Sequence, residues 1–430
     1  MNNSKDIIII GSGPAGLSVG NHLSNKDFLI LESLAEPGGL MRSKYINGYT
    51  FDWAGHIFFT KIERVKKWVE LLLGDNLHWQ DRESWVFSKN VFTRYPFQAN
   101  TFGLPKQVIK ECLMGLIDVT FNRQSTQITN FEEWILKTYG QGIATHFMLP
   151  YNRKLWARDL KTMDHHWLEG RVPQPGLEDF VDGALGPGRK DMGPNSRFGY
   201  PLKGGMRSLV EKLVSPIRDH IITHSQCTRI HPEKHRIQLH NGQEYSYGSL
   251  VLTCPLTDIL TMLDEYHTEL KSVIPQLNFV SVLCVNVGIH KPDLTDKHWI
   301  YFPESEFLFH RVFVQANASP HVCPDNCFSY TAEITYNDQK KVDFQQAGKQ
   351  TVEGLLKAGL LKSMDDVDVI DLINIPVAYI VPTHDRQILV SKIREWLSAH
   401  DIHLVGRFAE WAYYNMDHAL DAGWTLVSKL

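Results

Sequence analysis

Ile7-Ile8-Ile9-Ile10-Gly11-Ser12-Gly13-Pro14-Ala15-Gly16 leads from an apolar run into a glycine-rich turn, and after a helical stretch comes Phe28-Leu29-Ile30-Leu31-Glu32. This order of strand, glycine turn, helix, second strand and acid is the fingerprint of a Rossmann-type dinucleotide site. Gly11 permits the tight turn, Gly13 lets the backbone approach a pyrophosphate, and Gly16 lets helix and strand pack closely. The acid that ends the second strand can accept from ribose hydroxyls.

The chain after this unit departs from the continuation expected of a nicotinamide domain. Glu36-Pro37-Gly38-Gly39-Leu40 predicts a second glycine turn, and Tyr49-Thr50-Phe51-Asp52-Trp53-Ala54-Gly55-His56 predicts an aromatic, hairpin-like segment. An extended flavin dinucleotide needs such a second backbone approach near its ring. The helix N-terminus after the first turn offers unpaired N–H groups to the phosphates. The sequence therefore favours FAD over NAD as the cofactor.

Composition narrows the class of protein. The 430 residues are 43% hydrophobic and 21% charged, which is ordinary for a globular protein with two or three domains. A net charge of −4 gives no general basic surface for nucleic acid. The first residues show no signal-peptide pattern and no run of 18 apolar residues occurs, so we expect a cytoplasmic protein without a membrane span.

The cysteines and histidines do not predict a metal site. The six cysteines are scattered, mostly in apolar segments, and favour free thiols in a reducing compartment. Cys323 and Cys327 are close, but no second Cys or His pair completes a zinc site. His165 and His166 are adjacent and cannot share a helix face, so a structural role is expected.

The remaining pattern divides the chain coarsely. Residues 104 to 170 carry helical stripes, with Asn130 and Glu133 spaced as a capping box. Residues 172–195 are rich in Pro and Gly and predict a long loop, which is either a lid or a plain surface loop. Residues 223 to 254 predict strands around an Asn241-Gly242 turn, residues 278 to 334 are strand-rich, and residues 404 to 430 predict a strand and a helical tail.

These motifs together resemble the flavoenzyme family of UDP-galactopyranose mutases, in the family's order from residue 7 to about 418. Beside the two glycine turns and the Asp52-to-His56 segment, the resemblance rests on further pieces: Arg94-Tyr95-Pro96-Phe97-Gln98, Tyr151-Asn152-x-Lys154-x-Trp156, Gly170-Arg171-Val172, Gly193-Pro194-Asn195, Trp299-Ile300-Tyr301-Phe302-Pro303, His310-Arg311, Tyr379 with Pro382-Thr383, and Gly406-Arg407-Phe408-x-x-Trp411-x-Tyr413. Two of them, YPFQ and YNxKxW, are more similar to the eukaryotic-type mutases than to the short bacterial ones.

The resemblance implies an α/β fold in three parts. A discontinuous Rossmann-like FAD-binding domain would comprise residues 1–98, 196–265 and 390–430. An inserted helical substrate domain would comprise residues 99–195 with a mobile loop at 172–195. An antiparallel β-sheet substrate domain would comprise residues 266–389.

The resemblance also implies a reaction and an isomerase. Such mutases interconvert the pyranose and furanose forms of UDP-galactose, a step toward galactofuranose in cell-wall or glycan biosynthesis, without net redox change. N5 of the reduced flavin acts as the nucleophile at the anomeric carbon. An external reductant such as NAD(P)H is then expected, with a nucleotide sugar as the partner molecule. The oligomeric state stays open.

Site residues follow from the matched motifs. Arginine forks suit a diphosphate because they stay charged and bind oxygens in pairs. The resemblance implies catalytic roles for His56, Arg171, Arg311, Tyr379 and Tyr413. It implies substrate contacts for Phe97, Gln98, Asn152, Trp156, Asn195, Trp299 and Tyr301. It implies cofactor contacts for Gly11, Gly13, Gly16, Glu32, Gly39, Leu40, Arg42, Gly55, His56, Arg407 and Asp417.

Three positions depart from the family pattern. Ala54 replaces a glycine near the flavin face, Arg42 follows the second glycine turn where a small residue is usual, and Ala412 replaces a frequent arginine beside Tyr413. Core packing is an open alternative for Phe97 and Trp156. Three other functions also stay open: a mutase for a different nucleotide sugar, an amine-oxidase-like FAD oxidoreductase, and a catalytically silent homologue that binds nucleotide sugar.

Overall fold

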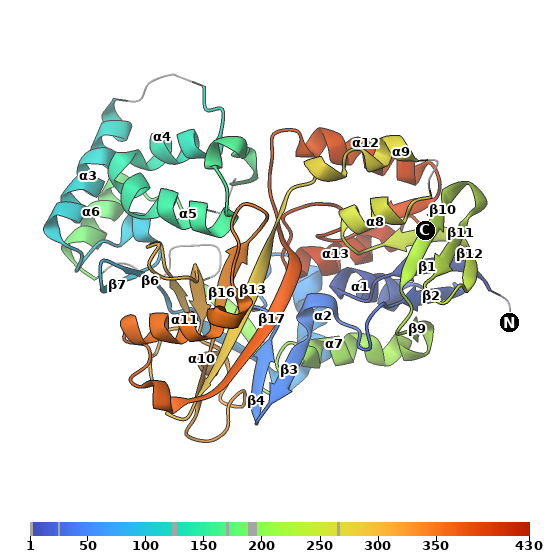
Figure 1. Cartoon of the computed structure of the whole chain (residues 1–430), viewed down its shortest axis with the longest axis horizontal. Coiled ribbons are helices and arrows are strands. Elements are labelled where there is room, and N and C mark those ends of the chain that lie inside the picture. The colour runs from blue at the N-terminus through green and yellow to red at the C-terminus, as the bar shows by residue number, and fades with distance from the viewer. Residues whose placement is uncertain (1–2, 25, 123–126, 169–171, 188–195, 265–266) are drawn as a thin grey trace.

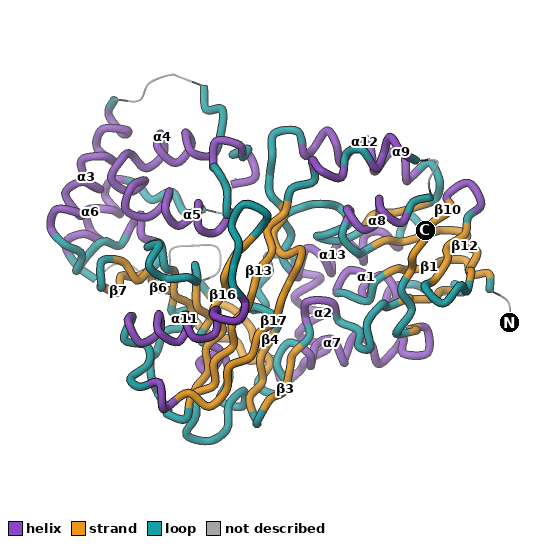
Figure 2. The backbone as a smooth tube through the Cα atoms, in the orientation of Figure 1, coloured by secondary structure: helices purple, strands orange, loops and turns teal. Residues whose placement is uncertain are grey.

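The computed structural model describes residues 3–24, 26–122, 127–168, 172–187, 196–264 and 267–430. Figure 1 shows three parts: a sheet with helices on both faces, a group of helices, and a second sheet between and below them. In Figure 2 most of the strands gather into these two sheets, and the helical part is built mainly of helices. The predicted mixed α/β class with a helical insertion and a second sheet is confirmed.

The first sheet is the dinucleotide-type sheet. Its order is β10-β11-β12-β1-β2-β9, with β18 beside β12. The strands β12, β1, β2, β9 and β18 run parallel, and β10 and β11 form an antiparallel edge. The strand bounds are Ser4–Ile10 for β1, Phe28–Leu31 for β2, Ile221–Ile222 for β9, Cys227–His231 for β10, Arg236–Leu239 for β11, Glu244–Leu252 for β12 and Ile402–Leu404 for β18.

Helices cover both faces of this sheet, which explains the unbroken apolar run in β1. Ile7 and Ile9 pack on one face, and Ile8 and Ile10 pack on the other. A parallel strand buried on both sides needs this composition. The first face is covered by α1 (Pro14–His22), α2 (Glu63–Leu73), α7 (Arg207–Val214) and α13 (Met416–Val427). The second face is covered by α8 (Leu256–Met262), α9 (Thr268–Lys271) and α12 (Arg386–Ser398).

The second sheet has the order β17-β13-β16-β15-β14-β6-β7. Neighbouring strands are antiparallel except β14 and β6. The bounds are Val367–Ile380 for β17, Phe279–Ile289 for β13, Phe328–Tyr336 for β16, Arg311–Phe313 for β15, Trp299–Tyr301 for β14, Ser84–Ser88 for β6 and Val91–Arg94 for β7. The short α10 (Gln315–Ala318) and the longer α11 (Phe344–Lys357) accompany it.

The placement of β6 and β7 differs from the expected division of the chain. The family resemblance places residues 1–98 in the FAD-binding domain, but these two strands extend the second sheet. The reason lies in their buried side chains. Val86 packs into the core of the helical part, and Phe87 packs into the core of the second sheet.

The helical part contains α3 (Lys106–Phe121), α4 (Phe131–Ile143), a π-helical turn (Ala144–Met148), α5 (Leu149–Trp156) and α6 (Leu177–Leu185). Asn130 caps α4 by accepting from the backbone of Glu133 at 3.0 Å, as its position predicts.

The helix α6 corrects the expectation of a structureless loop at 172–195. Its Phe180 is fully buried, and a Cβ on Gly183 would lie 1.7 Å from the carbonyl oxygen of Ala99. The Pro and Gly residues on either side mark the ends of a packed helix, because they punctuate helices as well as loops.

Two two-stranded sheets complete the fold. β3 (Ser43–Ile46) pairs with β4 (Tyr49–Asp52), so the predicted hairpin before His56 is present. Asn47 and Gly48 both have positive φ, as a two-residue turn of this kind requires. β5 (Leu77–Asp81) pairs with β8 (Arg197–Pro201). Within the described residues, every helix is too short or too polar to cross a membrane.

Candidate functional site

One large cavity of about 1360 Å³ lies among the three parts of the molecule. It is larger than the roughly 300–1,000 Å³ of an ordinary ligand pocket, so it has room for more than one ligand. Its walls include both predicted glycine turns, the Gly55-His56 segment, and side chains of α5 and of the second sheet. The motifs that lie far apart in the sequence therefore meet at one site.

The two glycine turns pack directly on each other at one end of this cavity. The N–H of Gly38 donates to the carbonyl of Ser12 at 2.9 Å. A Cβ on Gly39, whose φ is +57°, would lie 3.0 Å from Cα of Gly13. Gly16 does not line the cavity; a Cβ there would lie 2.0 Å from the carbonyl oxygen of Gly11. Because the glycines of the two turns have no side chains, the backbone of both turns can come close to a ligand in the cavity.

Two helix N-termini also meet the cavity. Pro14 and Ala15 at the start of α1, and Asp417 at the start of α13, lie in its wall. The unpaired N–H groups of such a terminus bind phosphate. Glu32 lies nearby, and its two oxygens accept from the N–H groups of Ser12 and Leu34, each at 3.0 Å. These residues fit the pyrophosphate and ribose of a dinucleotide.

The departure at Arg42 has a structural explanation. Its Nε donates to the carbonyl of Gly39 at 2.7 Å, and its guanidinium lies 3.8 Å from the ring centroid of Trp53. Arg42 and Leu40 both line the cavity. Arg42 thus stabilises the second glycine turn through its bond to Gly39, and it also places a positive charge in the wall of the cavity.

The Ala54-Gly55-His56 segment forms another part of the wall. Ala54 has a φ of +73°, a conformation that favours glycine, so its departure from the family pattern carries local strain. A Cβ on Gly55 would lie 2.5 Å from the Trp299 ring. Burial lowers the pKa of His56 to about 4, so its imidazole is neutral at pH 7. Its Nδ1 is buried and makes no hydrogen bond of normal geometry among the described residues, although the Trp53 backbone lies close to the imidazole.

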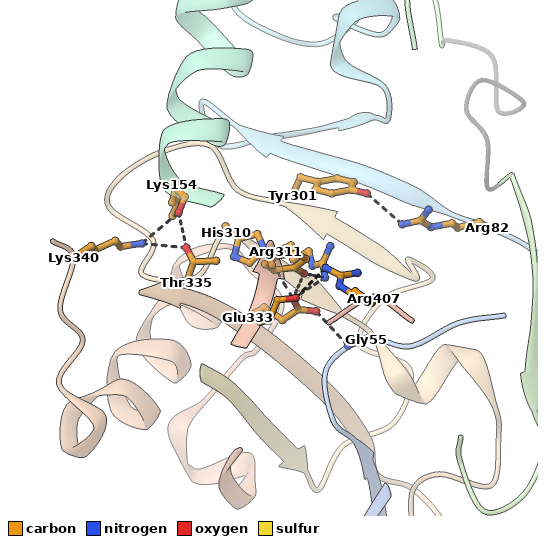
Figure 3. Close-up of polar contacts among 12 residues, drawn as sticks. Gly55, Arg82, Lys154, Tyr301, His310, Arg311, Glu333, Thr335, Lys340 and Arg407 are labelled. Carbon is orange, nitrogen blue, oxygen red and sulfur yellow. Dashed lines mark hydrogen bonds and ion pairs between the residues drawn. The ribbon is translucent and has the colours of Figure 1, made fainter. Parts of the chain in front are cut away.

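A charged cluster occupies the centre of the cavity wall (Figure 3). Nη2 of Arg311 lies 2.7 Å from Oε2 of Glu333 and donates to the hydroxyl of Tyr379 at 2.5 Å. Tyr379 donates to the same Glu333 oxygen at 3.2 Å, and the N–H of Gly55 donates to Oε1 at 3.2 Å. Burial raises the pKa of Tyr379 well above its usual value, so the hydroxyl keeps its proton. The cluster fixes a cation and a proton donor side by side.

Arg407 and Tyr413 lie next to this cluster. Arg407 donates to the carbonyls of Tyr414 at 2.6 Å and Ala378 at 2.9 Å, and its guanidinium lies 5.0 Å from the Tyr413 ring centroid. Both residues line the cavity, whereas the departing Ala412 does not. The replacement of the family's arginine by Ala412 therefore does not change a residue of the cavity wall.

The face toward the helical part is polar and aromatic. Gln98 and Asn152 line the cavity beside Tyr151. Nε2 of Gln98 donates to the carbonyl of Pro173 at 3.2 Å, and its Oε1 is buried without a partner among the described residues. Phe97 and Trp156 are fully buried behind this wall and do not line it. The structure thus places these two in the core of the helical part.

Trp299 and Tyr301 connect this face to the charged cluster. The Trp299 ring lies within cation–π distance of two guanidinium groups, 5.0 Å from Arg311 and 4.7 Å from Arg82. Arg82 also donates to the Tyr301 hydroxyl at 3.2 Å. Arg171 and Asn195 lie outside the described residues, so their predicted roles stay predictions.

Glu333 and Arg82 are among the cavity residues that the sequence predictions missed. Glu333 is fully buried at the centre of the cluster, and Arg82 lies beside Trp299. Glu333 carries a detectable signal, because it is the sole charged residue in the apolar strand Phe328–Tyr336. A charge in a buried strand needs a partner or a function. Arg82 lies between two polar residues and gives no such signal.

The Asp164-His165-His166 segment brings three potential metal ligands within 4.8 Å of one another. Oδ1 of Asp164 already accepts from Nδ1 of His166 at 2.6 Å and from the backbone N–H groups of His165 at 2.7 Å and His166 at 3.2 Å. These bonds cap the short helical turn at His166–Leu168.

Asp52 of the motif does not line the cavity but braces the hairpin beneath it. Its carboxylate accepts from Ser43 Oγ and Tyr200 Oη, both at 2.6 Å, and from the N–H of Met206 at 3.1 Å. Burial raises its pKa to about 6. The folded state therefore favours the protonated carboxyl, and stability from this group is lost as the pH rises from about 4 to about 6.

We expect Asp52→Asn to gain stability relative to the wild type as the pH rises. Their difference in unfolding free energy should grow by roughly 2–3 kcal/mol between pH 4 and pH 8, because Asn never ionises. Thermal melting of both proteins at the two pH values measures this. A difference that is the same at both pH values would show that Asp52 titrates normally in the fold.

Comparisons with known proteins agree with this geometry. The sequence matches the family model for flavin-containing amine oxidoreductases over residues 14–311. The chain belongs to that family. A flavin is accordingly its cofactor.

Solved structures place the chain more closely within the flavin-containing amine oxidoreductases. A reduced UDP-galactopyranose mutase matches with a TM-score of 0.93 and 29% identity, over 99% of this chain and 93% of that one. The predicted resemblance to that mutase is confirmed. Wild-type putrescine oxidase bound to putrescine shares the fold alone, with a TM-score of 0.67 and 14% identity over 99% and 98% of the two chains.

A third similarity covers only a short segment. Over 54 residues the chain is 48% identical to 4,4'-diapophytoene desaturase of Methylomonas sp.. The match spans 12% of this chain and 11% of the desaturase.

Proposed function

We propose that this protein is a flavin-dependent sugar-nucleotide mutase that interconverts the pyranose and furanose forms of UDP-galactose or a related nucleotide sugar. Its cofactor would be FAD in the reduced form, supplied with electrons by an external reductant such as NAD(P)H. The similarity to UDP-galactopyranose mutase across nearly the whole chain supports this proposal. The residues that line the cavity favour this function over the alternatives.

One observation supports the proposal most strongly: Arg311 lines the same cavity as the two glycine turns at Gly11–Gly13 and Gly39. Its side chain is 19% exposed and faces a fully buried Glu333. An amine substrate would be cationic and would gain nothing from a fixed guanidinium. A nucleotide diphosphate is anionic and matches that fork. The chemistry of this wall therefore favours a nucleotide sugar over an amine.

Arg311 and Tyr379 would hold the diphosphate together. In the structure both contact the same oxygen of Glu333, which fixes their positions before a ligand arrives. An entering phosphate can take a charged contact from Arg311, and a hydrogen bond from the Tyr379 hydroxyl once that hydroxyl turns its single proton from Glu333 to the phosphate. Preorganised donors of this kind cost no rearrangement when charge develops on the leaving diphosphate.

The other walls suit the remaining parts of such a substrate. The free oxygen of Gln98 and the nearby Asn152 offer amide groups to a uracil ring, and Tyr151 offers an aromatic surface. When bound and reduced, the flavin would supply the nucleophile for the anomeric carbon. His56 is neutral and would offer the flavin a hydrogen-bonding imidazole from the cavity wall.

The alternative is an amine-oxidase-like oxidoreductase, which the shared family leaves open. Purified holoenzyme offered a panel of primary amines and polyamines under air separates the two functions. We expect no amine-dependent oxygen uptake at an oxygen electrode, because the cavity presents a cation to the substrate. Oxygen uptake that saturates with one of these amines would contradict the mutase proposal.

A further inference from the structure

Lys154 joins two parts of the molecule that both line the cavity. It lies on α5, two residues after Asn152. Its Nζ donates to the carbonyl of Phe302 at 3.0 Å and to that of Glu304 at 2.8 Å, both just beyond β14. These bonds connect the helical part directly to the second sheet.

The same residue is also held through its backbone. Thr335 of β16 donates its hydroxyl to the carbonyl of Lys154, and Lys340 Nζ lies 3.5 Å from that carbonyl (Figure 3). Lys340 also lies 3.5 Å from Thr335 Oγ1. The side chain of Lys154 thus contacts the segment just after β14, and its backbone carbonyl contacts β16.

The environment of this amine is unusual for a lysine. Within the described residues, no carboxylate lies at ion-pair distance from Lys154 or Lys340. The carboxylate of Glu304 instead contacts Ser88 and Lys89. The buried amine donates to two carbonyls, while the charges of Glu304, Glu306 and Lys340 act on it from beyond ion-pair distance, so it gives up hydration without gaining a direct ion pair. Charge pairing therefore does not explain why the amine lies at this junction.

The strands β14 and β16, which lie at or next to this junction, carry residues of the proposed ligand site. Tyr301 immediately precedes Phe302, and Glu333 lies two residues before Thr335. On the helix, Tyr151 and Asn152 lie within one turn of Lys154. A shift at this junction would change the distance between the α5 wall and the Arg311–Glu333–Tyr379 cluster.

We propose that Lys154 is a positioning residue for nucleotide binding. It fixes α5 against the second sheet, so that Tyr151 and Asn152 reach one end of the ligand while Arg311 reaches the other. This inference rests on the proposed function, because it assumes that a uridine nucleotide spans both walls. It assigns Lys154 no contact with the ligand.

The test measures UDP binding and steady-state kinetics of variant holoenzymes. Lys154→Met should weaken UDP binding and raise KM for the nucleotide sugar by about tenfold, the scale of lost charge-assisted hydrogen bonds, while kcat changes less than about twofold. Lys154→Arg, which keeps donors for the carbonyls, should recover most of the affinity. Arg153→Met is the matched control, because it removes an exposed cation of the same helix that pairs with Glu132 and leaves every contact of Lys154 in place, so it should bind UDP as the wild type does.

Thr335→Val gives an independent test that does not alter the buried amine. It is nearly isosteric and removes only the hydroxyl that holds the Lys154 carbonyl, so UDP affinity should fall by about threefold. FAD content and melting temperature check that each variant is folded. Wild-type UDP affinity in folded Lys154→Met, or in Thr335→Val should Lys154→Met not fold, would overturn the inference. Failure of the wild type to bind UDP would instead overturn the proposed function.

Discussion

Arg311→Ala is expected to lower kcat/KM for the nucleotide sugar by at least about a hundredfold while FAD stays bound, because it removes the cation that faces the diphosphate. The buried carboxylate of Glu333 would lose its 2.7 Å partner, so the variant should also be less stable. Arg311→Lys keeps a charge for Glu333 but loses the paired geometry of the fork. We expect it to fold normally and still lose most activity.

Controls separate the catalytic effect from the loss of stability. Arg311→Met combined with Glu333→Gln removes both charges, and it should recover stability without recovering turnover. Arg153→Ala removes an exposed arginine of α5 that pairs with Glu132 at 2.8 Å, and it should behave as wild type. Steady-state kinetics, FAD absorbance and thermal melting measure all of these. Turnover near wild type in Arg311→Ala would remove the diphosphate role, and loss of FAD would move Arg311 to the cofactor site.

Gly16→Ala is expected to abolish FAD binding or folding altogether. The new methyl group would lie 2.0 Å from the carbonyl oxygen of Gly11 and 3.3 Å from the Ile9 side chain. The first of these contacts is with backbone, so the strand, turn and helix would have to separate, which costs more than the roughly 1–3 kcal/mol of ordinary overpacking. The FAD to protein ratio after purification, measured by absorbance, should fall below about a tenth of the wild-type value.

Gly186→Ala is the matched control for that substitution. Gly186 ends α6, its φ is −152°, and no heavy atom lies within 4 Å of an added Cβ. It should retain full FAD content and the wild-type melting temperature. Normal FAD binding by Gly16→Ala would mean that the glycine turn does not hold the cofactor in the way proposed.

Much of the cofactor end could be predicted from the sequence, because backbone conformation there depends on particular residue types. Gly11 and Gly39 have φ values of +98° and +57°, and Gly16 admits no side chain. Such requirements leave a local signal at fixed spacing. The family resemblance then extended the prediction to distant residues such as Arg311 and Tyr379, which the cavity does bring together.

Other features depended on tertiary contacts that local sequence does not report. The Pro and Gly residues around α6 predict a loop, and only the packing of Phe180 and Gly183 shows a helix. The strand β6 follows the first domain in sequence but pairs with β14, more than 200 residues away. Phe97 and Trp156 match a substrate-binding motif, yet their burial places them behind the wall.

The structure explains the local setting of Ala54, one of the positions that depart from the family pattern. Its positive φ identifies why glycine is favoured at this position, one residue before the N–H that contacts Glu333. Arg42 similarly proves to be a brace for the second glycine turn and a ring partner of Trp53. Neither departure removes a donor from the Arg311–Glu333–Tyr379 cluster.

The central claim is a reaction that needs reduced flavin and consumes no reductant. UDP-galactofuranose should be incubated anaerobically with dithionite-reduced holoenzyme and with the same preparation left oxidised, and the products separated by anion-exchange chromatography. We expect UDP-galactopyranose from the reduced enzyme alone, over many turnovers for each reduction. Equal conversion by the oxidised enzyme, or product formed only in proportion to reductant consumed, would contradict the account.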